Sequence, residues 1–304
     1  MKIVNVIGGL GNQMFQCAFA IALKEIFNED VYIDIHHYKN PYPKTFRGNN
    51  FFHNGYEVSK LFRNFDLPIA SPAQVMKYSY YIPNYYISRI ARRLLPIRNT
   101  EYVQSYMEAY NYRRDDSIFQ DKKYFEGYWM TPLYFNAYRN IIIEKFRFKS
   151  FDTIENILIE QKLKSSNSIT VHIRRGDYVG SSSFGGICTL TYYRNAIREA
   201  RKFIQNPEFY IFSNDQDWCL NHLGDVFSDS LVHFITHNKG INSYRDMQLM
   251  MLARCNILAN SSFSWWGAYL NQRDDQLVFC PNKWHNQFDC SKIYVDSWIK
   301  IDIG

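Results

Sequence analysis

Residues 168–178 read SITVHIRRGDY, from Ser168 to Tyr178. The first six residues are rich in β-branched and apolar side chains, which predicts a strand over Ser168–Ile173. Two arginines, a glycine and an aspartate follow directly, so charged groups gather where this strand ends. Ligands of open α/β sheets bind outside the carboxyl ends of the strands. This stretch therefore predicts the class of fold and the edge of the sheet at which a ligand should bind.

After this stretch, strand patterns alternate with helical patterns to the end of the chain. Strands are expected at 209–212, 231–234, 256–259 and 277–279, and helices near 190–204, 217–223, 243–254 and 264–270. Such alternation is typical of a parallel, doubly wound sheet. The sequence therefore predicts an α/β domain in this half of the chain.

The amino-terminal half opens with a unit of the same kind. A strand over Ile3–Ile7 runs into the glycine-rich turn GGLGNQ at 8–13, and Met14–Phe27 has the apolar spacing of a helix. Val31–Ile35 supplies another strand. Prolines and aromatic residues break the pattern from about residue 38 to 118, which indicates insertions into a first α/β domain.

Length and charge limit the number of domains and the kind of ligand. The 304 residues suit two domains, expected at 1–155 and 156–304. A net charge of +6 favours anionic ligands such as nucleotides. Basic residues do not gather into one stripe with interleaved aromatic residues, so nucleic-acid binding is not expected. The six cysteines include no CxxC pair, which makes a zinc site or a disulfide framework unexpected.

The sequence also bears on location. It contains no signal-peptide pattern and no apolar run of about 20 residues, so a place in the cytoplasm is expected. Residues 84–98 hold four arginines among apolar residues and would form a basic amphipathic helix. Such a helix either docks on the core with its basic face in solvent or makes peripheral contact with the inner membrane.

The charged residues that follow the strand have the chemistry of an anion site. The guanidinium of Arg174 or Arg175 can donate two parallel hydrogen bonds to a phosphate and keeps its charge. Strand alternation sends His172 and Arg174 to one face of the sheet. The structural alternatives are an arginine pair that bridges to surface carboxylates and a satisfied core histidine.

The glycine-rich turn is a second candidate for phosphate binding. Gly9 and Gly11 permit close approach of the backbone, and Asn12 and Gln13 add polar groups where a helix begins. The pattern is neither a dinucleotide fingerprint nor a Walker loop, because neither the third glycine nor a Gly-Lys-Ser/Thr ending is present. A tight structural turn is the alternative.

Two further segments carry polar groups at strand ends. Ser261 and Ser262 stand between an expected strand and an expected helix, where they could cap the helix or bind phosphate. Asp215 and Asp217 form a DxD pair of the kind that holds a divalent ion. Asp217 begins a helical pattern and the arginines already supply positive charge, so no metal is expected.

Together, the motifs GGLGNQ, HIRRGDY and ANSSFSWWGAYLN closely resemble the α-1,2-fucosyltransferases of glycosyltransferase family 11. They span residues 8–271, so the resemblance covers most of the chain. It implies a GT-B-like α/β fold, with two Rossmann-like doubly wound domains facing a cleft. The first would be the acceptor-side domain and the second the GDP-fucose-binding domain.

The resemblance also implies the reaction. The expected activity is inverting transfer of L-fucose from GDP-β-L-fucose to the 2-hydroxyl of a terminal galactose, on a galactose-terminated oligosaccharide and without a metal or other cofactor. The wider group of enzymes that use GDP-fucose shares a His-x-Arg strand end, a helical aspartate and a Ser-Ser-Phe turn. These features match His172, Arg174, Asp246, Ser261, Ser262 and Phe263. By this likeness Arg174 binds the diphosphate, Asp246 accepts hydrogen bonds from guanine, and the Ser-Ser turn binds phosphate.

One segment departs from the family pattern. Residues 126–131, EGYWMT, resemble a Gly-Tyr-Trp-Gln-Ser segment, with Met130 and Thr131 in place of the polar pair. Tyr128 and Trp129 are therefore candidates for acceptor binding, and the departure leaves the choice of acceptor open.

Catalysis by such an enzyme requires stabilisation of the leaving diphosphate and removal of a proton from the acceptor. Arg174, with Arg175 close by, suits the first task. Asp177 is the first candidate for the base because it lies beside the arginines, and orienting an arginine is an equal alternative. His172 is a candidate donor to ribose or phosphate. Competing functions are another linkage such as α-1,6, a different nucleotide sugar, and a non-catalytic nucleotide-sugar-binding protein.

Overall fold

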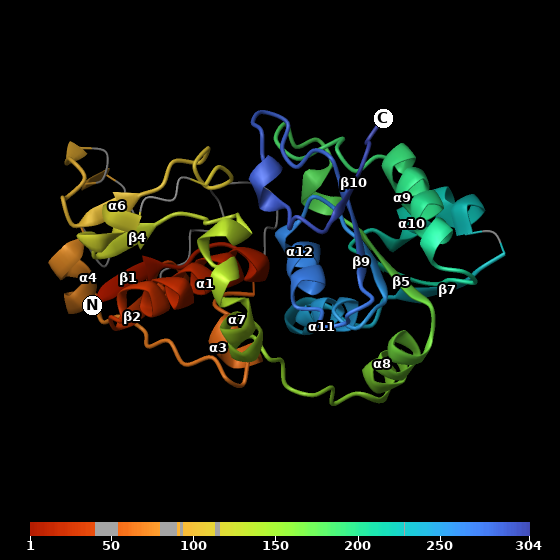
Figure 1. The fold of residues 1–304 in the computed structure, drawn as a ribbon, viewed down its shortest axis with the longest axis horizontal. Helices are drawn as coiled ribbons and strands as arrows, with labels where there is room; N and C mark the ends of the chain where they lie inside the picture. Colours follow the sequence, from red (N-terminus) through yellow and green to blue (C-terminus); the bar gives the residue numbers. More distant parts are fainter. Residues whose placement is uncertain (40–53, 80–89, 92–93, 113–115, 228) are drawn as a thin grey trace. The chain divides into compact units, whose positions relative to one another are not determined.

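The computed structural model describes residues 1–39, 54–79, 90–91, 94–112, 116–227 and 229–304 (Figure 1). These residues form two compact units, Met1–Lys149 and Ser150–Gly304. The second unit starts a few residues before the expected position 156. The reason is that Arg245 donates hydrogen bonds to the Ser150 carbonyl at 3.1 Å and to Asp152 at 2.8 Å, which ties this stretch to the second unit.

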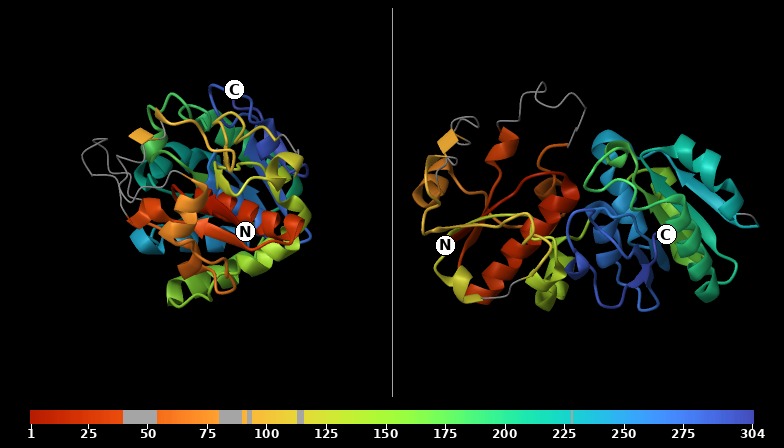
Figure 2. Two further views of the ribbon diagram at one scale, coloured as in Figure 1. Left: turned by 90° about the vertical axis from the view of Figure 1, so that its left-hand side faces the viewer. Right: turned by 90° about the horizontal axis from the view of Figure 1, so that it is seen from above.

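The first unit contains a parallel sheet of strand order β2-β1-β4-β3. Its strands are β1 (Lys2–Asn5), β2 (Val31–Asp34), β3 (Glu101–Val103) and β4 (Tyr124–Glu126). Its helices are α1 (Leu10–Phe27), α2 (His36–Lys39), α3 (Val58–Leu61), α4 (Pro72–Tyr78), α6 (Asp116–Gln120) and α7 (Arg139–Lys145), with 3-10 turns at Pro132–Tyr134 and Asn136–Tyr138. Helix α1 runs along the sheet and is buried along most of its length (Figure 2).

The glycine turn before α1 is tighter than the sequence predicts. The helix begins at Leu10 rather than at Met14, so the second half of the motif is helical. Gly8 has a φ of +84°, and a Cβ there would lie 2.9 Å from the side-chain nitrogen of Asn12. Only glycine combines this backbone conformation with such close approach.

The second unit contains a six-stranded parallel sheet of order β10-β9-β8-β5-β6-β7. Its strands are β5 (Ser168–Ile173), β6 (Glu208–Ser213), β7 (Leu231–Ile235), β8 (Cys255–Ile257), β9 (Leu277–Pro281) and β10 (Ile299–Ile301). Its helices are α8 (Ile154–Ser165), α9 (Leu190–Phe203), α10 (Gln216–Leu223), α11 (Tyr244–Met250) and α12 (Ser262–Tyr269), with 3-10 turns at Gly176–Tyr178, Gly224–Phe227, Gly240–Asn242 and Ser291–Ile293.

Helices cover both faces of the second sheet (Figure 1). Ile169, Val171 and Ile173 of β5 pack with α9 and α10 on one face. Tyr210 and Phe212 of β6 pack with α8 and α11 on the other. The predicted doubly wound α/β arrangement is confirmed in this unit.

The order of the strands marks a place for a ligand. Read from β7 to β10, the order is that of the Rossmann fold, in which strands are added first on one side and then on the other side of the first strand. Here the reversal falls between β5 and β8, after which the chain leads to helices on opposite faces of the sheet, α9 after β5 and α12 after β8. This topological switch point is where ligands of such sheets bind.

The two tryptophans of the motif at 259–271 lie in the core, and the basic segment 84–98 is described only in part. Trp265 and Trp266 are fully buried, and the Trp265 ring nitrogen donates to the Ile293 carbonyl at 2.8 Å, so both belong to the core. Residues 84–89 and 92–93 of the basic segment lie outside the described residues. Among the residues that are described, no helix has the length and apolar character needed to cross a membrane.

Candidate active site

At the switch point of the second sheet, the loop after β5 contacts the loop after β8. Arg174 directly follows β5, and Asn260 and Ser261 lead from β8 into α12. The Tyr178 hydroxyl donates to the Asn260 carbonyl at 3.2 Å, which joins the loop after β5 to the loop after β8. The sequence motifs HIRRGDY and NSSF are therefore brought to one edge of one sheet.

Arg174 is held in place at this edge. Its guanidinium forms an ion pair with Asp177 Oδ1 at 2.7 Å and lies 5.5 Å from the centre of the Tyr178 ring. About a third of the Arg174 side chain remains exposed (35%), so the cation is positioned but can still meet a ligand. The ion pair engages one oxygen of the Asp177 carboxylate, so Asp177 is placed to orient Arg174.

Arg175 points to a different partner. Its Nε donates to Asp215 Oδ2 at 2.9 Å, and its guanidinium lies 4.2 Å from the centre of the Trp218 ring. The hydrogen bond from Arg175 lowers the pKa of the Asp215 carboxyl. Asp215 Oδ1 also accepts from the Trp218 amide and caps α10. Arg175 is thus anchored beside β6, as expected for an arginine that bridges to a surface carboxylate.

The close approach of the loops after β5 and β6 depends on Gly176. A Cβ at this position would lie 2.1 Å from the Asn214 side-chain nitrogen, and Asn214 Oδ1 accepts from the Arg175 amide at 3.0 Å. A side chain at position 176 would displace Asn214 and disturb its hydrogen bond with the Arg175 amide, so the glycine keeps the two loops in contact.

His172 is a neutral side chain of the buried sheet. Burial, followed by the charge of Arg174, lowers its pKa to about 3. Its ring centre lies 5.8 Å from that of Phe263, and its Nδ1 has no hydrogen-bond partner among the described residues. A neutral imidazole can donate or accept one hydrogen bond, but it carries no charge to a phosphate at neutral pH.

Asp246 stands in the first turn of α11, with its carboxyl group in a polar network. Asn238 donates to Asp246 Oδ1 at 2.9 Å, and Asn156 in turn donates to Asn238 at 2.9 Å. Burial raises the pKa of Asp246 to about 7, and the Asn238 hydrogen bond opposes this effect in part. A carboxyl group poised to ionise near neutral pH suits recognition of paired N–H donors.

The serine turn has two distinct members. Ser261 is buried and its hydroxyl accepts from the Phe263 amide at 3.3 Å, so it caps α12. Ser262, the first residue of α12, is half-buried. The start of this helix lies at the switch point, where backbone N–H groups favour an anion.

Candidate residues of the first unit are more deeply built into the core than the sequence suggests. The Gln13 amide donates to the Gly8 and Gly55 carbonyls, at 3.1 and 2.8 Å, and its oxygen accepts from the Glu57 amide. Gln13 therefore closes the glycine turn and does not face a ligand. Gly11 is also buried in α1, whereas Asn12 is half-buried.

The acceptor candidates need a similar correction. Trp129 is fully buried and stacks on Phe19 at 3.8 Å between ring centres, so its ring cannot offer a surface to a sugar. Tyr128 remains half-buried, and its ring contacts Tyr106 edge-on at 6.1 Å.

The structure also reveals a polar pair at the carboxyl end of β2. His36 Nδ1 lies 2.6 Å from Asp34 Oδ2, which also accepts from the Tyr124 hydroxyl at 2.8 Å. A carboxylate in this position fixes the tautomer of the imidazole. The signal in the sequence is DIHHY, with an aspartate near the end of a predicted strand and two histidines directly after that strand. Within the described part of the chain, no group of three or more His, Cys, Asp or Glu residues is placed to hold a metal ion.

Comparison with known proteins identifies the family. A model described as glycosyl transferase family 11 matches residues 104–302. An α-1,2-colitosyltransferase of Escherichia coli is 31% identical over 99% of this chain and 98% of its own length. The O-antigen biosynthesis glycosyltransferase WbnK of Escherichia coli is 31% identical over 58% of this chain and 59% of its own length.

Solved structures agree on the fold. Fucosyltransferase NodZ from Bradyrhizobium aligns with a TM-score of 0.51 and 15% identity, over 87% of this chain and 90% of NodZ. FUT1 of Arabidopsis thaliana aligns with a TM-score of 0.53 and 10% identity, over 92% of this chain and 70% of that one. These similarities support a GT-B-like fold. With the family match over residues 104–302, they show that the chain is a glycosyltransferase and belongs to glycosyltransferase family 11.

Proposed function

We propose that this enzyme transfers L-fucose from GDP-β-L-fucose to the 2-hydroxyl of a terminal galactose, with inversion at the anomeric carbon and without a metal ion. The observation that carries the proposal is the guanidinium of Arg174, held by Asp177 at the switch point beside the start of α12. The names of related proteins support the sugar and the linkage, since a mouse relative with 25% identity over 59% of this chain is a galactoside 2-α-L-fucosyltransferase.

In this proposal Arg174 acts on the leaving group. Negative charge builds on the β-phosphate as the bond to the sugar breaks, and a prepositioned guanidinium stabilises that charge more in the transition state than in the ground state. Backbone N–H groups at the start of α12, with Ser262, would bind the same diphosphate. Asp177 then serves as a positioning residue that keeps the guanidinium aimed at the phosphate.

The remaining groups would bind the nucleoside. Asp246, once ionised, accepts hydrogen bonds from the two N–H donors on one edge of guanine. His172, which is neutral, can donate one hydrogen bond to ribose or phosphate, and Phe263 lies against its ring. The roles of Gly9 and Asn12 in phosphate binding stay predictions of the sequence.

The donor sugar has a second candidate, colitose. Colitose differs from fucose only in lacking the 3-hydroxyl, and the relative that aligns over 99% of this chain is a colitosyltransferase. A site that hydrogen-bonds a substrate hydroxyl rejects the analogue without it by about 10⁴-fold or more. The ratio of kcat/KM for GDP-fucose and GDP-colitose therefore separates the two donors.

The decisive experiment incubates the protein with GDP-fucose and a panel of galactosides in excess EDTA, followed by linkage analysis of the product. An α-1,2-linked product with inverted anomeric configuration is expected. An α-1,6-linked product would replace the linkage assignment, and activity that requires added manganese would restore the DxD pair as a metal site. Binding of GDP-fucose without transfer or hydrolysis would indicate a non-catalytic protein.

A further inference from the structure

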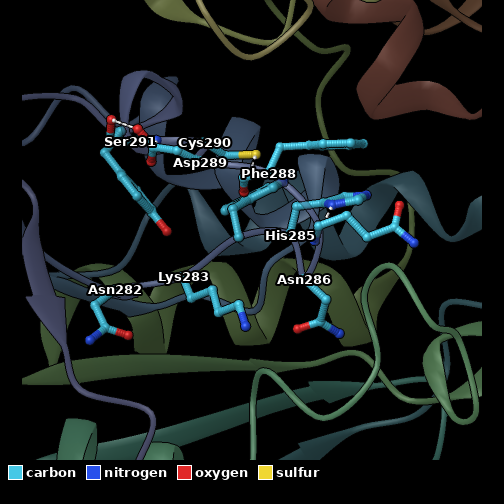
Figure 3. A pocket seen from close by; sticks show the side chains of 11 residues that line it. Asn282, Lys283, His285, Asn286, Phe288, Asp289, Cys290 and Ser291 are labelled. Atoms are coloured by element: carbon cyan, nitrogen blue, oxygen red, sulfur yellow. Dashed lines mark hydrogen bonds between the residues drawn. The ribbon is translucent and has the colours of Figure 1, made fainter. Parts of the chain in front are cut away.

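A polar cavity of about 310 Å³ lies just beyond the carboxyl end of β9 (Figure 3). It is formed by residues 282–291 together with Tyr294. This volume is at the lower end of the range that is usual for small-molecule sites. No part of the cavity is used by the groups proposed above to bind GDP.

The walls of the cavity are fixed by hydrogen bonds to other loops. The backbone amide of Asn282 donates to the Ile301 carbonyl at 2.9 Å. The Asn286 side chain donates to the Gly185 carbonyl at 2.8 Å, and its backbone amide donates to the Ser183 carbonyl at 2.8 Å. A loop anchored at both sides is preorganised, so a ligand need not order it on binding.

The lining combines buried rings with a polar rim. Trp284 and Tyr294 are buried, and their ring centres lie 6.0 Å apart. In Figure 3, the side chains of Asn282, Lys283 and Asn286 lie opposite those of Phe288, Asp289 and Ser291. Both rings are buried and offer no open face for stacking, so binding would depend on the polar rim, whose amides, hydroxyls and ammonium can bond to the hydroxyls of a pyranose.

The charges in the wall favour a neutral ligand over a phosphate. Asp289 accepts hydrogen bonds from the backbone amide and the hydroxyl of Ser291, at 2.9 and 3.0 Å, and its carboxylate would repel an anion. Lys283 is exposed at the rim and brings one opposite charge. A polar, uncharged sugar fits this mixture better than a diphosphate does.

One residue connects the cavity to the donor edge. The Asn260 side chain donates to the Trp284 carbonyl at 3.1 Å and to the Phe184 carbonyl at 3.2 Å, while the Asn260 carbonyl accepts from Tyr178. The Phe184 ring lies between those of Tyr178 and His285, at 5.2 and 4.8 Å between centres. The cavity and the switch point therefore share a wall.

We propose that this cavity binds one neutral hexose unit of the acceptor glycan beside the donor site. The proposal rests on the proposed glycosyl transfer, because only an enzyme that takes a saccharide acceptor needs such a subsite. The Tyr294 hydroxyl, which is buried and has no hydrogen-bond partner among the described residues, is the polar group in the lining that a bound sugar would satisfy.

The test compares Lys283→Gln and Tyr294→Phe with Lys239→Gln, an exposed lysine of the same unit that does not line the cavity. Saturation-transfer NMR with methyl β-D-galactopyranoside, in the presence of GDP, reports sugar binding without turnover. KM values for the acceptor and for GDP-fucose are measured in parallel. Loss of one hydrogen bond should weaken binding about 5- to 10-fold.

The expected result is a saturation-transfer signal that Lys283→Gln and Tyr294→Phe reduce, with a raised KM for the acceptor and an unchanged KM for GDP-fucose. A raised KM for GDP-fucose alone would make the cavity part of the donor site and overturn the proposal. Unchanged KM values, with a higher Tm for Tyr294→Phe, would show that the hydroxyl is merely an unsatisfied core group. Sugar binding without any fucosyl transfer would refute the proposed reaction and leave the subsite standing.

Discussion

Substitution of Asp246 by asparagine tests how the nucleotide is recognised. In the protein without ligand, burial raises the pKa of Asp246 from 3.8 to about 7. Between these two values the folded state binds a proton that the unfolded chain has lost, so stability declines as pH rises from about 4 to about 7 and levels off above that. The difference between the two pKa values corresponds to a decrease of at most about 4 kcal/mol in the free energy of unfolding.

Asp246→Asn removes this penalty because the asparagine stays neutral and can still accept from Asn238. We expect its free energy of unfolding to exceed that of the wild type at pH 8 and to match it at pH 4. GDP binding should weaken about 10- to 100-fold, because charge-assisted hydrogen bonds worth about 1.5–3 kcal/mol are lost. Wild-type affinity for GDP should fall as the pH drops below about 7, since GDP binds the ionised carboxylate and binding then expels a proton.

Urea denaturation at pH 4 and pH 8 and calorimetric titration with GDP, in two buffers of different ionisation enthalpy, measure these effects. Asp274→Asn is the matched control, because Asp274 is exposed and lies outside the site. Equal stability of Asp246→Asn and wild type at pH 8, together with a GDP affinity within twofold of wild type, would refute the role of Asp246.

Three further predictions concern the loop after β5. Arg174→Lys keeps the charge but loses the planar guanidinium, so kcat should fall about a hundredfold, which corresponds to a barrier higher by roughly 3 kcal/mol. The circular dichroism spectrum should not change. Near-normal turnover would contradict the assignment of Arg174 to the phosphate. Asp177→Asn should lower kcat about tenfold without moving the pH–rate profile, because it only loosens Arg174; loss of one limb of the profile would instead identify Asp177 as the base. Arg175→Ala removes the contacts with Asp215 and Trp218, so Tm should fall by about 2–4 °C while GDP affinity stays unchanged. A large loss of GDP affinity would instead show that Arg175 binds the phosphate.

The second unit could be predicted well because its strands are long and its periodicity is regular. β5, β6 and β7 have five or six residues each and lie within two residues of the expected ranges. β10 was missed because Ile299–Ile301 is a three-residue strand with an exposed lysine at its centre. Short strands such as β3 and β4 in the first unit give no alternation to detect for the same reason.

The site could be predicted only at the level of the sheet edge. The position of Arg174 after a strand indicated an anion-binding residue, but the sequence alone does not show that Arg174 and Arg175 have different ion-pair partners. That distinction depends on Asp215, which a parallel neighbouring strand brings alongside. Trp129 was mistaken for a ligand contact because an aromatic residue in a loop segment looks the same in sequence whether it faces solvent or the core.

The anchored loop 282–291 also has a consequence for engineering. It is one continuous stretch of ten residues, held at its start by Asn282, in its middle by Asn286, and at Trp284 by the contact with Asn260. If these three asparagines and the buried Trp284, His285 and Cys290 are kept, the exposed positions of the loop can be exchanged together. If the loop binds the acceptor as proposed, a library confined to these positions would vary glycan preference while the residues proposed to bind GDP stay unchanged.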